Sequence, residues 1–183
     1  MPDEVRRSVL TAAHDELTRW GLERFDIPTM CKRHKIDEAV VTRYWGDGSK
    51  LALDALLYWS DDILTPPDTG SLRTDLQALA AAAARQVNTD AGRSLLRAMV
   101  VNDRAALADD TRMAFWIRRF EGIRTVFDRA AERREIRDGV DMIAAMQLVL
   151  APINVRALYT KDPIEESYCD AIADLAWHAI ARH

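Results

Sequence analysis

The 183-residue sequence is poor in the residues that disulfide-rich domains and metal centres depend on. It has only two cysteines, Cys31 and Cys169, which lie far apart and form no C-x-x-C pair. We therefore expect two reduced, buried thiols in a cytoplasmic protein rather than a disulfide framework. The four histidines show no metal-ligand spacing, so we expect no metal site and no cofactor.

Long apolar stretches, strand signals and catalytic motifs are also missing. No apolar run approaches 18 residues and no charged-then-apolar leader is present, so we expect neither a membrane span nor a signal peptide. There is no glycine-rich phosphate loop, nucleophile elbow or zinc-protease pair. Paired acidic residues such as Asp61-Asp62 fall at expected helix boundaries, where capping explains them. These absences argue against an all-α enzyme, which stays the weakest of the alternatives.

What remains is a succession of helix signals. Hydrophobic spacing predicts helices over about 3–20, 26–34, 38–44 and 49–64. Asp26 and Asp37 are placed to cap the second and third of these. The segment 66–70, Pro-Pro-Asp-Thr-Gly, is the clearest break, so we expect domains at 1–64 and 65–183, with the helix at 49–64 bridging them. The first helix should bury one stripe, formed by Val9, Ala12, Ala13, Leu17 and Trp20.

The most informative segment is 36–45, Ile-Asp-Glu-Ala-Val-Val-Thr-Arg-Tyr-Trp. Here Ile36 can pack inward, Asp37 can cap, and Val41 and Trp45 can anchor a short helix. This layout is typical of a helix-turn-helix whose second helix enters a DNA major groove, where Val40 is placed to touch a thymine methyl. The predicted DNA-binding residues are Lys35, Glu38, Ala39, Val40, Thr42, Arg43, Tyr44 and Lys50.

On these residues the N-terminal third resembles the DNA-binding domain of the TetR family of bacterial transcriptional regulators. Gly21 stands where that family ends its first helix, Tyr44-Trp45 stands for its aromatic pair, and Lys50 for the lysine that opens its fourth helix. The resemblance implies a homodimer that binds a palindromic operator in double-stranded DNA.

The N-terminal segment departs from the family pattern in ways that bear on DNA affinity. The family's turn glycine is Lys35 here, and its frequent phosphate-binding tyrosine is Thr42. Residues 1–64 carry 9 basic and 12 acidic side chains, and the whole chain has a net charge of −4, although a nucleic-acid binder is usually more basic. A regulator-derived helical ligand-binding protein with weak or lost DNA binding is therefore the alternative function.

The C-terminal part predicts five more helices, over about 71–87, from 90 onward, 110–134, 141–160 with Pro152 inside, and 163–181 with Pro163 in the first turn. The last two predicted helices resemble the dimerisation helices of the TetR family. The resemblance lies in the sequence pattern of residues 135–141 and of Leu150-Ala-Pro152. One apolar side of the helix at 141–160 carries Met142, Ala145, Met146, Val149, Ile153 and Tyr159. A second apolar surface would lie in water in a monomer. The predicted dimer interface is Leu148, Val155, Tyr159, Tyr168, Ile172, Leu175 and Trp177.

Aromatic and methionine side chains gather in the middle helices. Such a cluster is either ordinary core or the lining of an effector cavity. Read as a cavity, it predicts a small, largely apolar effector held by Met99, Asn102, Phe115, Trp116, Phe120, Phe127 and Met146. Together these features predict an all-α protein of about nine helices, with a helix-turn-helix domain followed by a helical effector-binding and dimerisation domain. Its expected function is transcriptional regulation, most simply as a repressor that the effector releases from DNA.

Overall fold

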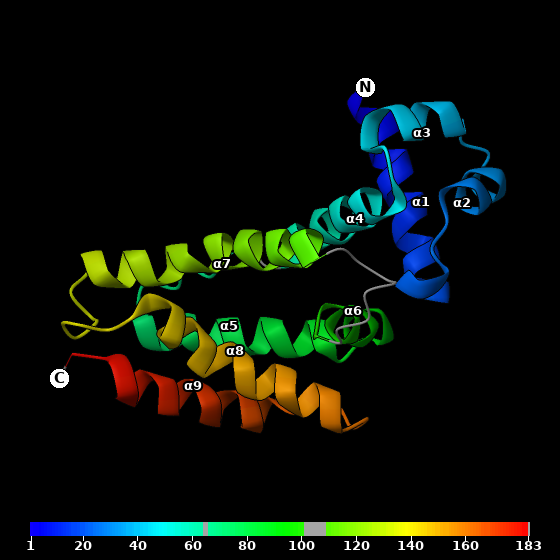
Figure 1. Ribbon diagram of the computed structural model, residues 1–183. Helices are drawn as coiled ribbons and strands as arrows, with labels where there is room; N and C mark the ends of the chain where they lie inside the picture. The colour runs from blue at the N-terminus through cyan, green and yellow to red at the C-terminus, as the bar shows by residue number, and fades with distance from the viewer. Residues whose placement is uncertain (64–65, 101–108, 183) are drawn as a thin grey trace. The chain divides into compact units, whose positions relative to one another are not determined.

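The computed structural model describes the backbone of residues 1–63, 66–100 and 109–182. It describes their side chains except those of Glu23, residues 59–63, Ala91, Ser94, Ala98, Met99, residues 109–112, Ala114, Phe115 and Arg118. Within the described ranges the chain forms nine α-helices, one 3-10 turn and a single isolated β-bridge (Figure 1). The prediction of an all-α fold with about nine helices is therefore confirmed.

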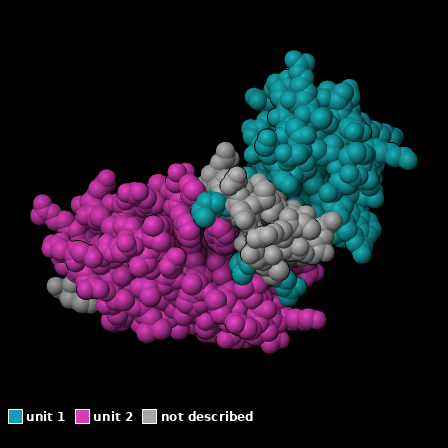
Figure 2. All heavy atoms as spheres, in the orientation of Figure 1, with its two compact units in different colours: residues 1–62, 94–115 teal, residues 63–93, 116–183 magenta. Residues whose placement is uncertain are grey.

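The helices are α1 (Asp3–Trp20), α2 (Ile27–His34), α3 (Glu38–Trp45), α4 (Gly48–Ile63), α5 (Leu72–Val87), α6 (Asp90–Val100), α7 (Asp109–Glu132), α8 (Met142–Tyr159) and α9 (Glu166–Ile180). They form two compact units, one of residues 1–62 and 94–115 and the other of residues 63–93 and 116–183 (Figure 2). The expected domain division after residue 64 stays a prediction.

The first unit has a core built from the apolar sides of α1 to α4. Its fully buried members include Met30 and Val41, which were expected inside, and also Leu10 and Leu51, which were not among the expected inward residues. Trp20, in contrast, was expected inside and is 48% exposed at the end of α1, so that prediction is wrong. Its ring lies instead under a guanidinium, with Arg33 Cζ 5.4 Å from the ring centroid. A cation over an aromatic face explains how a tryptophan is tolerated at this surface.

The second unit is organised around α5, which packs against both α8 and α9, while α8 and α9 also pack on each other. Small side chains make this close approach possible, because Ala80, Ala83 and Ala84 of α5 are buried. Asp141 caps α8 as predicted, accepting a hydrogen bond from the Ala144 amide at 2.8 Å. The core of the second unit therefore includes a contact of these three helices, to which α7 adds the buried Val126 and Phe127.

Two polar side chains fix the segment between α8 and α9 to the corner between α5 and α6. Asn88 makes a two-way pair with the main chain of Ile164: Nδ2 donates to its carbonyl at 3.0 Å, and Oδ1 accepts from its amide at 2.7 Å. Arg93, which is 8% exposed, donates to three carbonyls, those of Val87, Thr160 and Asp162, at 2.7 to 2.9 Å.

This attachment explains why α9 starts later than the sequence predicts. Pro163 was expected in the first turn of the last helix, but α9 begins at Glu166, so that prediction is wrong. Ile164 is buried, and both of its main-chain groups are bound to Asn88. The Ile164 carbonyl accepts from Asn88, and the Tyr168 amide donates to Glu165 rather than to Ile164, so the helical hydrogen bonds of α9 begin after this residue.

Helix α8 is the one described helix that is long and apolar enough to cross a membrane by length and composition, with a mean hydropathy of 1.4 over 18 residues. Its inner side, which includes Val149 and Ile153, is buried. Tyr159 was placed on that inner side and is 85% exposed, so that prediction is wrong. Six residues beyond Ile153 amount to about one and two-thirds turns, which carries Tyr159 well around the helix.

Candidate nucleic-acid interface

The first helix of the predicted helix-turn-helix is capped as its sequence indicates. Asp26 accepts a hydrogen bond from the Thr29 amide at 3.0 Å, and Pro28 lies in the first turn of α2, where no amide is needed. Its hydrogen bonds with Thr29 hold the pKa of Asp26 below its usual value. The charged carboxylate therefore stabilises this end of the helix.

The turn between α2 and α3 uses an unusual residue. Lys35 has φ 56° and ψ 42°, the left-handed conformation that a glycine adopts at no steric cost. The following amide, of Ile36, donates to the Cys31 carbonyl at 2.9 Å and closes the end of α2. A left-handed lysine costs about 1 kcal/mol relative to glycine at this position.

Helix α3 is anchored by the residues expected to face inward. Asp37 caps it, accepting from the Ala39 amide at 2.9 Å, while Val41 is fully buried and Trp45 is 7% exposed. The Trp45 indole N–H donates to Asp54 Oδ2 of α4 at 3.0 Å. Sequence reasoning did not identify Asp54, because nothing in the spacing of nine residues marks it as a partner of the indole. The hydrogen bond fixes the end of α3 on α4.

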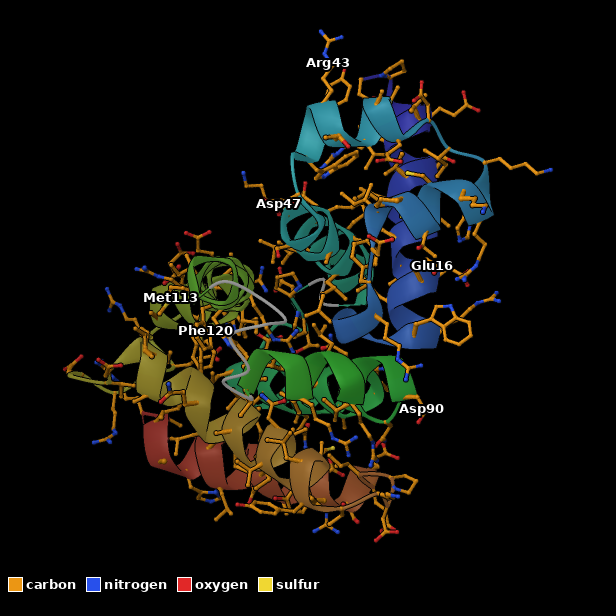
Figure 3. The ribbon with its side chains drawn as sticks, turned by 45° about the vertical axis from the view of Figure 1, so that its right-hand side comes forward. Glu16, Arg43, Asp47, Asp90, Met113 and Phe120 are labelled. Carbon is orange, nitrogen blue, oxygen red and sulfur yellow. The ribbon has the colours of Figure 1, made fainter. Side chains whose placement is uncertain are left out.

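With Val41 and Trp45 inside, the opposite side of α3 is presented to solvent. The predicted DNA-contacting side chains that are exposed are Lys35, Glu38, Ala39, Thr42, Arg43, Tyr44 and Lys50, and Val40 is half-buried. Figure 3 shows Arg43 projecting outward from α3. Tyr44 is 51% exposed, and its ring meets that of Trp45 edge-on at 6.5 Å between centroids. The structure thus brings the predicted side chains of this helix to one surface.

The loop after α3 places an acidic residue beside Lys50, a predicted DNA contact. Gly46 has φ 77° and ψ −49°, a conformation that favours glycine, and ends α3. Asp47 then accepts from the Lys50 amide at 2.9 Å, and its other oxygen lies 3.8 Å from Lys50 Nζ. This arrangement caps α4 and partly neutralises Lys50. Sequence reasoning missed Asp47, although an aspartate three residues before Lys50 was a readable capping signal.

The predicted effector residues are described only in part. Trp116 and Phe120 are half-buried and stack with 5.8 Å between centroids and 26° between planes. Phe127 is fully buried and Met146 is 2% exposed. Asn102 lies outside the described residues, as do the side chains of Met99 and Phe115. The described part therefore gives a stacked aromatic pair on α7 and two buried side chains.

The predicted dimer-interface residues divide into two groups. Leu148, Val155, Tyr159 and Leu175 are exposed, by 45%, 48%, 85% and 68%. Tyr168, Ile172 and Trp177 are half-buried. Two of these take part in cation–π contacts within the chain: Arg156 Cζ lies 4.6 Å from the Tyr168 ring, and Arg73 Cζ lies 4.9 Å from the Trp177 ring. Ile143, which sequence reasoning left out, is 57% exposed on α8.

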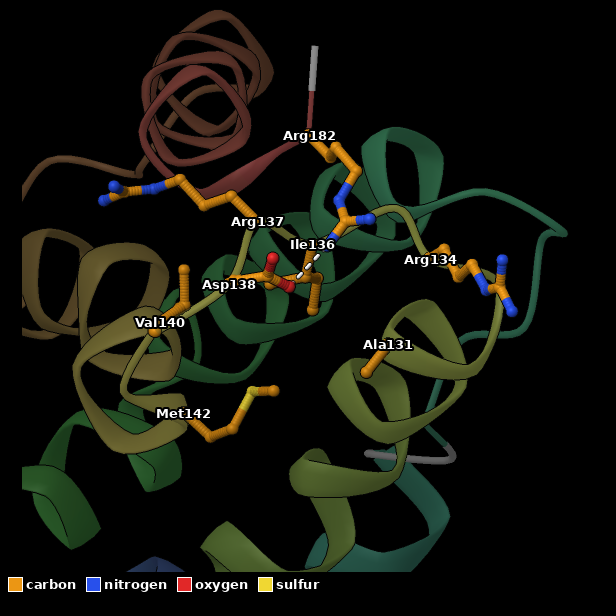
Figure 4. A pocket seen from close by; sticks show the side chains of 9 residues that line it. Ala131, Arg134, Ile136, Arg137, Asp138, Val140, Met142 and Arg182 are labelled. Carbon is orange, nitrogen blue, oxygen red and sulfur yellow. Dashed lines mark hydrogen bonds and ion pairs between the residues drawn. The ribbon is translucent and has the colours of Figure 1, made fainter.

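The second unit also has a surface pocket of about 410 Å³ between the end of α7, the start of α8 and the C-terminal segment (Figure 4). An ion pair between Arg182 and Asp138 crosses it. Arg134 and Arg137 extend in opposite directions in Figure 4, so the described residues that line this pocket do not converge on a common ligand. We assign it no function.

Comparison with known proteins identifies the family. The sequence model of the family described as "Tetracyclin repressor-like, C-terminal domain" matches residues 66–176. The HTH-type transcriptional regulator YdeS of Bacillus subtilis is 26% identical over 176 residues, which cover 94% of this chain and 86% of YdeS. The HTH-type transcriptional regulator AqdR of Rhodococcus erythropolis is 26% identical over 136 residues, or 74% of this chain and 66% of AqdR.

Solved structures show the same fold. The TetR family transcription regulator SCO0332 superposes with a TM-score of 0.77 at 23% identity, covering 98% of this chain and all of that one. The TetR regulator TylP of Streptomyces fradiae gives a TM-score of 0.72 at 16% identity, over 98% and 88% of the two chains. The helix-turn-helix geometry agrees with these findings. The model of the family's C-terminal domain matches more than half of the length of this chain. The chain therefore belongs to the TetR family of DNA-binding transcriptional regulators and is not an enzyme.

Proposed function

We propose that this regulator is a cytoplasmic homodimeric repressor that binds a palindromic operator through α3 and leaves it when a small apolar effector binds. The observation that carries the DNA-binding part is the orientation of α3. Its Asp37 cap, with Val41 and Trp45 buried, leaves Thr42, Arg43 and the neighbouring predicted contacts in solvent. An exposed helix held by a capped turn is what major-groove reading needs.

Arg43 tests this proposal most directly. It is exposed on α3 and has no hydrogen bond or ion pair to any described residue, so its removal should leave the fold intact. We expect Arg43→Ala to weaken operator binding by about 1–3 kcal/mol, the size of a lost contact to a base. Mobility shifts with the intergenic DNA next to the gene measure this, with Arg24→Ala, exposed in the 3-10 turn 22–24 outside this surface, as the matched control.

The dimer is supported by apolar side chains that the single chain leaves in water. Leu148, Val155 and Tyr159 of α8 follow one another at seven and four residues, so they lie along one side of the helix, and Leu175 is exposed on α9. A two-fold axis at this surface would bring each residue close to its own copy. Leu148→Arg should then give folded monomers that have lost operator binding, because both half-sites must be engaged together. A wild-type monomer at micromolar concentration in sedimentation experiments would contradict this.

The alternative function, a ligand-binding protein derived from a regulator with little DNA affinity left, rests on the acidic balance of residues 1–64 and on Asp47 beside Lys50. The same mobility shifts separate the two functions. Negligible binding by the wild type at low salt, with Arg43→Ala unchanged, would favour the alternative.

A further inference from the structure

Three metal-ligating atoms face one another where the end of α2 packs on α1. They are Oδ2 of Asp15, Oε1 of Glu16 and Nε2 of His34, all within 4.8 Å of one another. His34 Nε2 lies 3.0 Å from the Glu16 oxygen and 3.6 Å from the Asp15 oxygen. In Figure 3, Glu16 lies on α1 beside α2. The two carboxylates are neighbours in sequence, and the imidazole arrives from 18 residues further on.

The remaining carboxylate oxygens are bound by arginines. Arg19 Nε donates to Asp15 Oδ1 at 2.9 Å, and Arg33 Nη1 donates to Glu16 Oε2. In each carboxylate, the hydrogen bond from an arginine to one oxygen therefore fixes the orientation of the group. The other oxygen is turned toward His34 Nε2. Hydrogen bonds of this kind to the non-ligating atoms are what positions the ligands of protein metal sites.

The three groups differ in burial in the way that an accessible site requires. The Glu16 side chain is 7% exposed, while those of Asp15 and His34 are 36% and 26% exposed. Asp15 and His34 also line an open groove of about 500 Å³ whose other walls are Glu4, Arg7, Ser8, Thr11, Ala12 and Ile36. An ion held by Asp15 and His34 would border this groove and have room for water on that side.

We propose that Asp15, Glu16 and His34 form a binding site for a divalent transition-metal ion of the Zn²⁺ class. Bonds of about 2.0–2.2 Å from such an ion to oxygen and nitrogen place neighbouring ligands roughly 3–3.6 Å apart, which is the separation of His34 from each carboxylate. Two carboxylates and one imidazole suit zinc and similar ions. Because the imidazole must be neutral to bind, metal uptake releases protons at low pH.

The position of this site also gives it a regulatory consequence, which rests on the proposed DNA-binding function. His34 is the last residue of α2, immediately before the left-handed Lys35 and two residues before Ile36. An ion that ties His34 to α1 would stabilise the turn that orients α3. Occupied protein should therefore bind the operator more tightly than metal-free protein.

Metal titration of the dialysed full-length protein tests the site. We expect calorimetry to give one Zn²⁺ per chain, and Co²⁺ to give visible absorption bands without the sulfur charge-transfer band of a cysteine ligand. His34→Gln should lower the Zn²⁺ affinity at least tenfold, as should Asp15→Asn, whose carboxylate is more exposed and whose loss threatens the fold less. His178→Gln is the matched control, because His178 lies 3.4 Å from a carboxylate oxygen, that of Asp174, on the other unit. Equal Zn²⁺ affinity in the wild type and both site variants would overturn the proposal.

The regulatory consequence is measured separately, by operator affinity with and without Zn²⁺. We expect Zn²⁺ to tighten wild-type binding several-fold and to have no effect on the His34→Gln variant. If Zn²⁺ binds but operator affinity stays the same, the regulatory consequence is wrong and the metal site stands. If no DNA binds in either state, the proposed function fails independently of the site.

Discussion

Nη2 of Arg133 lies 3.1 Å from Oδ2 of Asp75, a carboxylate with no exposure to solvent. Asp75 also accepts from the amide and the hydroxyl of Thr69, both at 2.7 Å. Nε of Arg133 donates to Glu135 at 2.8 Å, and Glu135 in turn accepts from the Leu72 amide at the start of α5. These hydrogen bonds, first to Glu135 and then to Asp75, raise the pKa of Arg133. The cluster joins the segment after α7 to the first turn of α5.

Removing the cation should therefore cost more than a surface ion pair does. In Arg133→Met the buried carboxylate keeps its Thr69 partners but loses its counter-charge. We expect a loss of about 2–3 kcal/mol in the free energy of unfolding, less than the roughly 3–5 kcal/mol of a fully buried pair because the Arg133 side chain is 28% exposed. Chemical denaturation measures it. Arg134→Met, next in sequence and exposed, is the control and should change stability by less than about 0.5 kcal/mol.

Asp47 should weaken DNA binding in the wild type. Its carboxylate is 56% exposed, lies 3.8 Å from Lys50 Nζ and would repel phosphate. Asp47→Asn keeps an oxygen that can accept from the Lys50 amide, so we expect α4 to stay capped and operator affinity to rise about two- to five-fold at low salt. Lys50→Ala should act in the opposite direction on all sequences and reduce the salt slope by about one unit. Titrations at several salt concentrations measure both, and weaker binding by Asp47→Asn would contradict the prediction.

His14 should make the protein less stable in mild acid. Burial lowers the pKa of His14, more than the nearby Asp15 raises it. The unfolded chain therefore takes up this proton at a higher pH than the folded one, so the contribution of His14 is complete above its unfolded pKa of about 6.5 and declines as the pH falls below it. Between pH 8 and pH 5 the melting temperature of the wild type should fall further than that of His14→Gln. Parallel curves for the two proteins would show that His14 contributes nothing to the pH dependence.

The aromatic pair on α7 gives a test of the proposed effector site. An effector that releases DNA must bind the DNA-incompetent state more tightly, by about 1–3 kcal/mol of coupling. The compounds to test are hydrophobic small molecules of the metabolic pathway that the adjacent genes encode. We expect them to quench tryptophan fluorescence in the wild type but not in Trp116→Phe. They should also dissociate the complex of the wild type with operator DNA. Phe120→Ala should weaken both effects, while Phe25→Ala, half-buried in the first unit, should leave effector affinity unchanged. If no such compound changes the melting temperature of the protein, Trp116 and Phe120 are ordinary core residues and do not line an effector site.

The helix-turn-helix could be predicted closely because its signals are local. The aspartate caps at 26 and 37 lie within three residues of the amides they accept from, and α1 has the predicted bounds. The turn at Lys35 is also a local feature. The two helices on either side of it are so close in sequence that the chain must change direction within one turn. The spacing of the apolar residues in the sequence was therefore enough to predict which side of α3 is exposed.

Two of the failures, the start of α9 and the exposure of Trp20, involve partners that are distant in sequence. The start of α9 depends on Asn88, 76 residues before Ile164. The exposure of Trp20 depends on the apolar side chains available at the end of α1, and its cover comes from Arg33 on another helix. The grouping of Asp15 and Glu16 with His34 requires knowing that the end of α2 lies on α1, so a search for regular histidine spacing passes over it. Periodicity describes one helix at a time and contains no information on which helix ends meet.

Among the described residues, the side chains of Arg93 and Asn88 hydrogen-bond to main-chain atoms alone, in the segment between α8 and α9 and in their own corner. A main-chain carbonyl is present whatever side chain the residue carries. The segment is therefore free to change its sequence over evolutionary time, apart from the buried Ile164, as long as its backbone keeps its path. The arginine and the asparagine have less freedom, because only arginine offers three carbonyls a planar cationic donor, and only a carboxamide of the right length pairs with both the amide and the carbonyl of Ile164. Relatives that keep this corner should retain those two residues while the segment that they hold diverges.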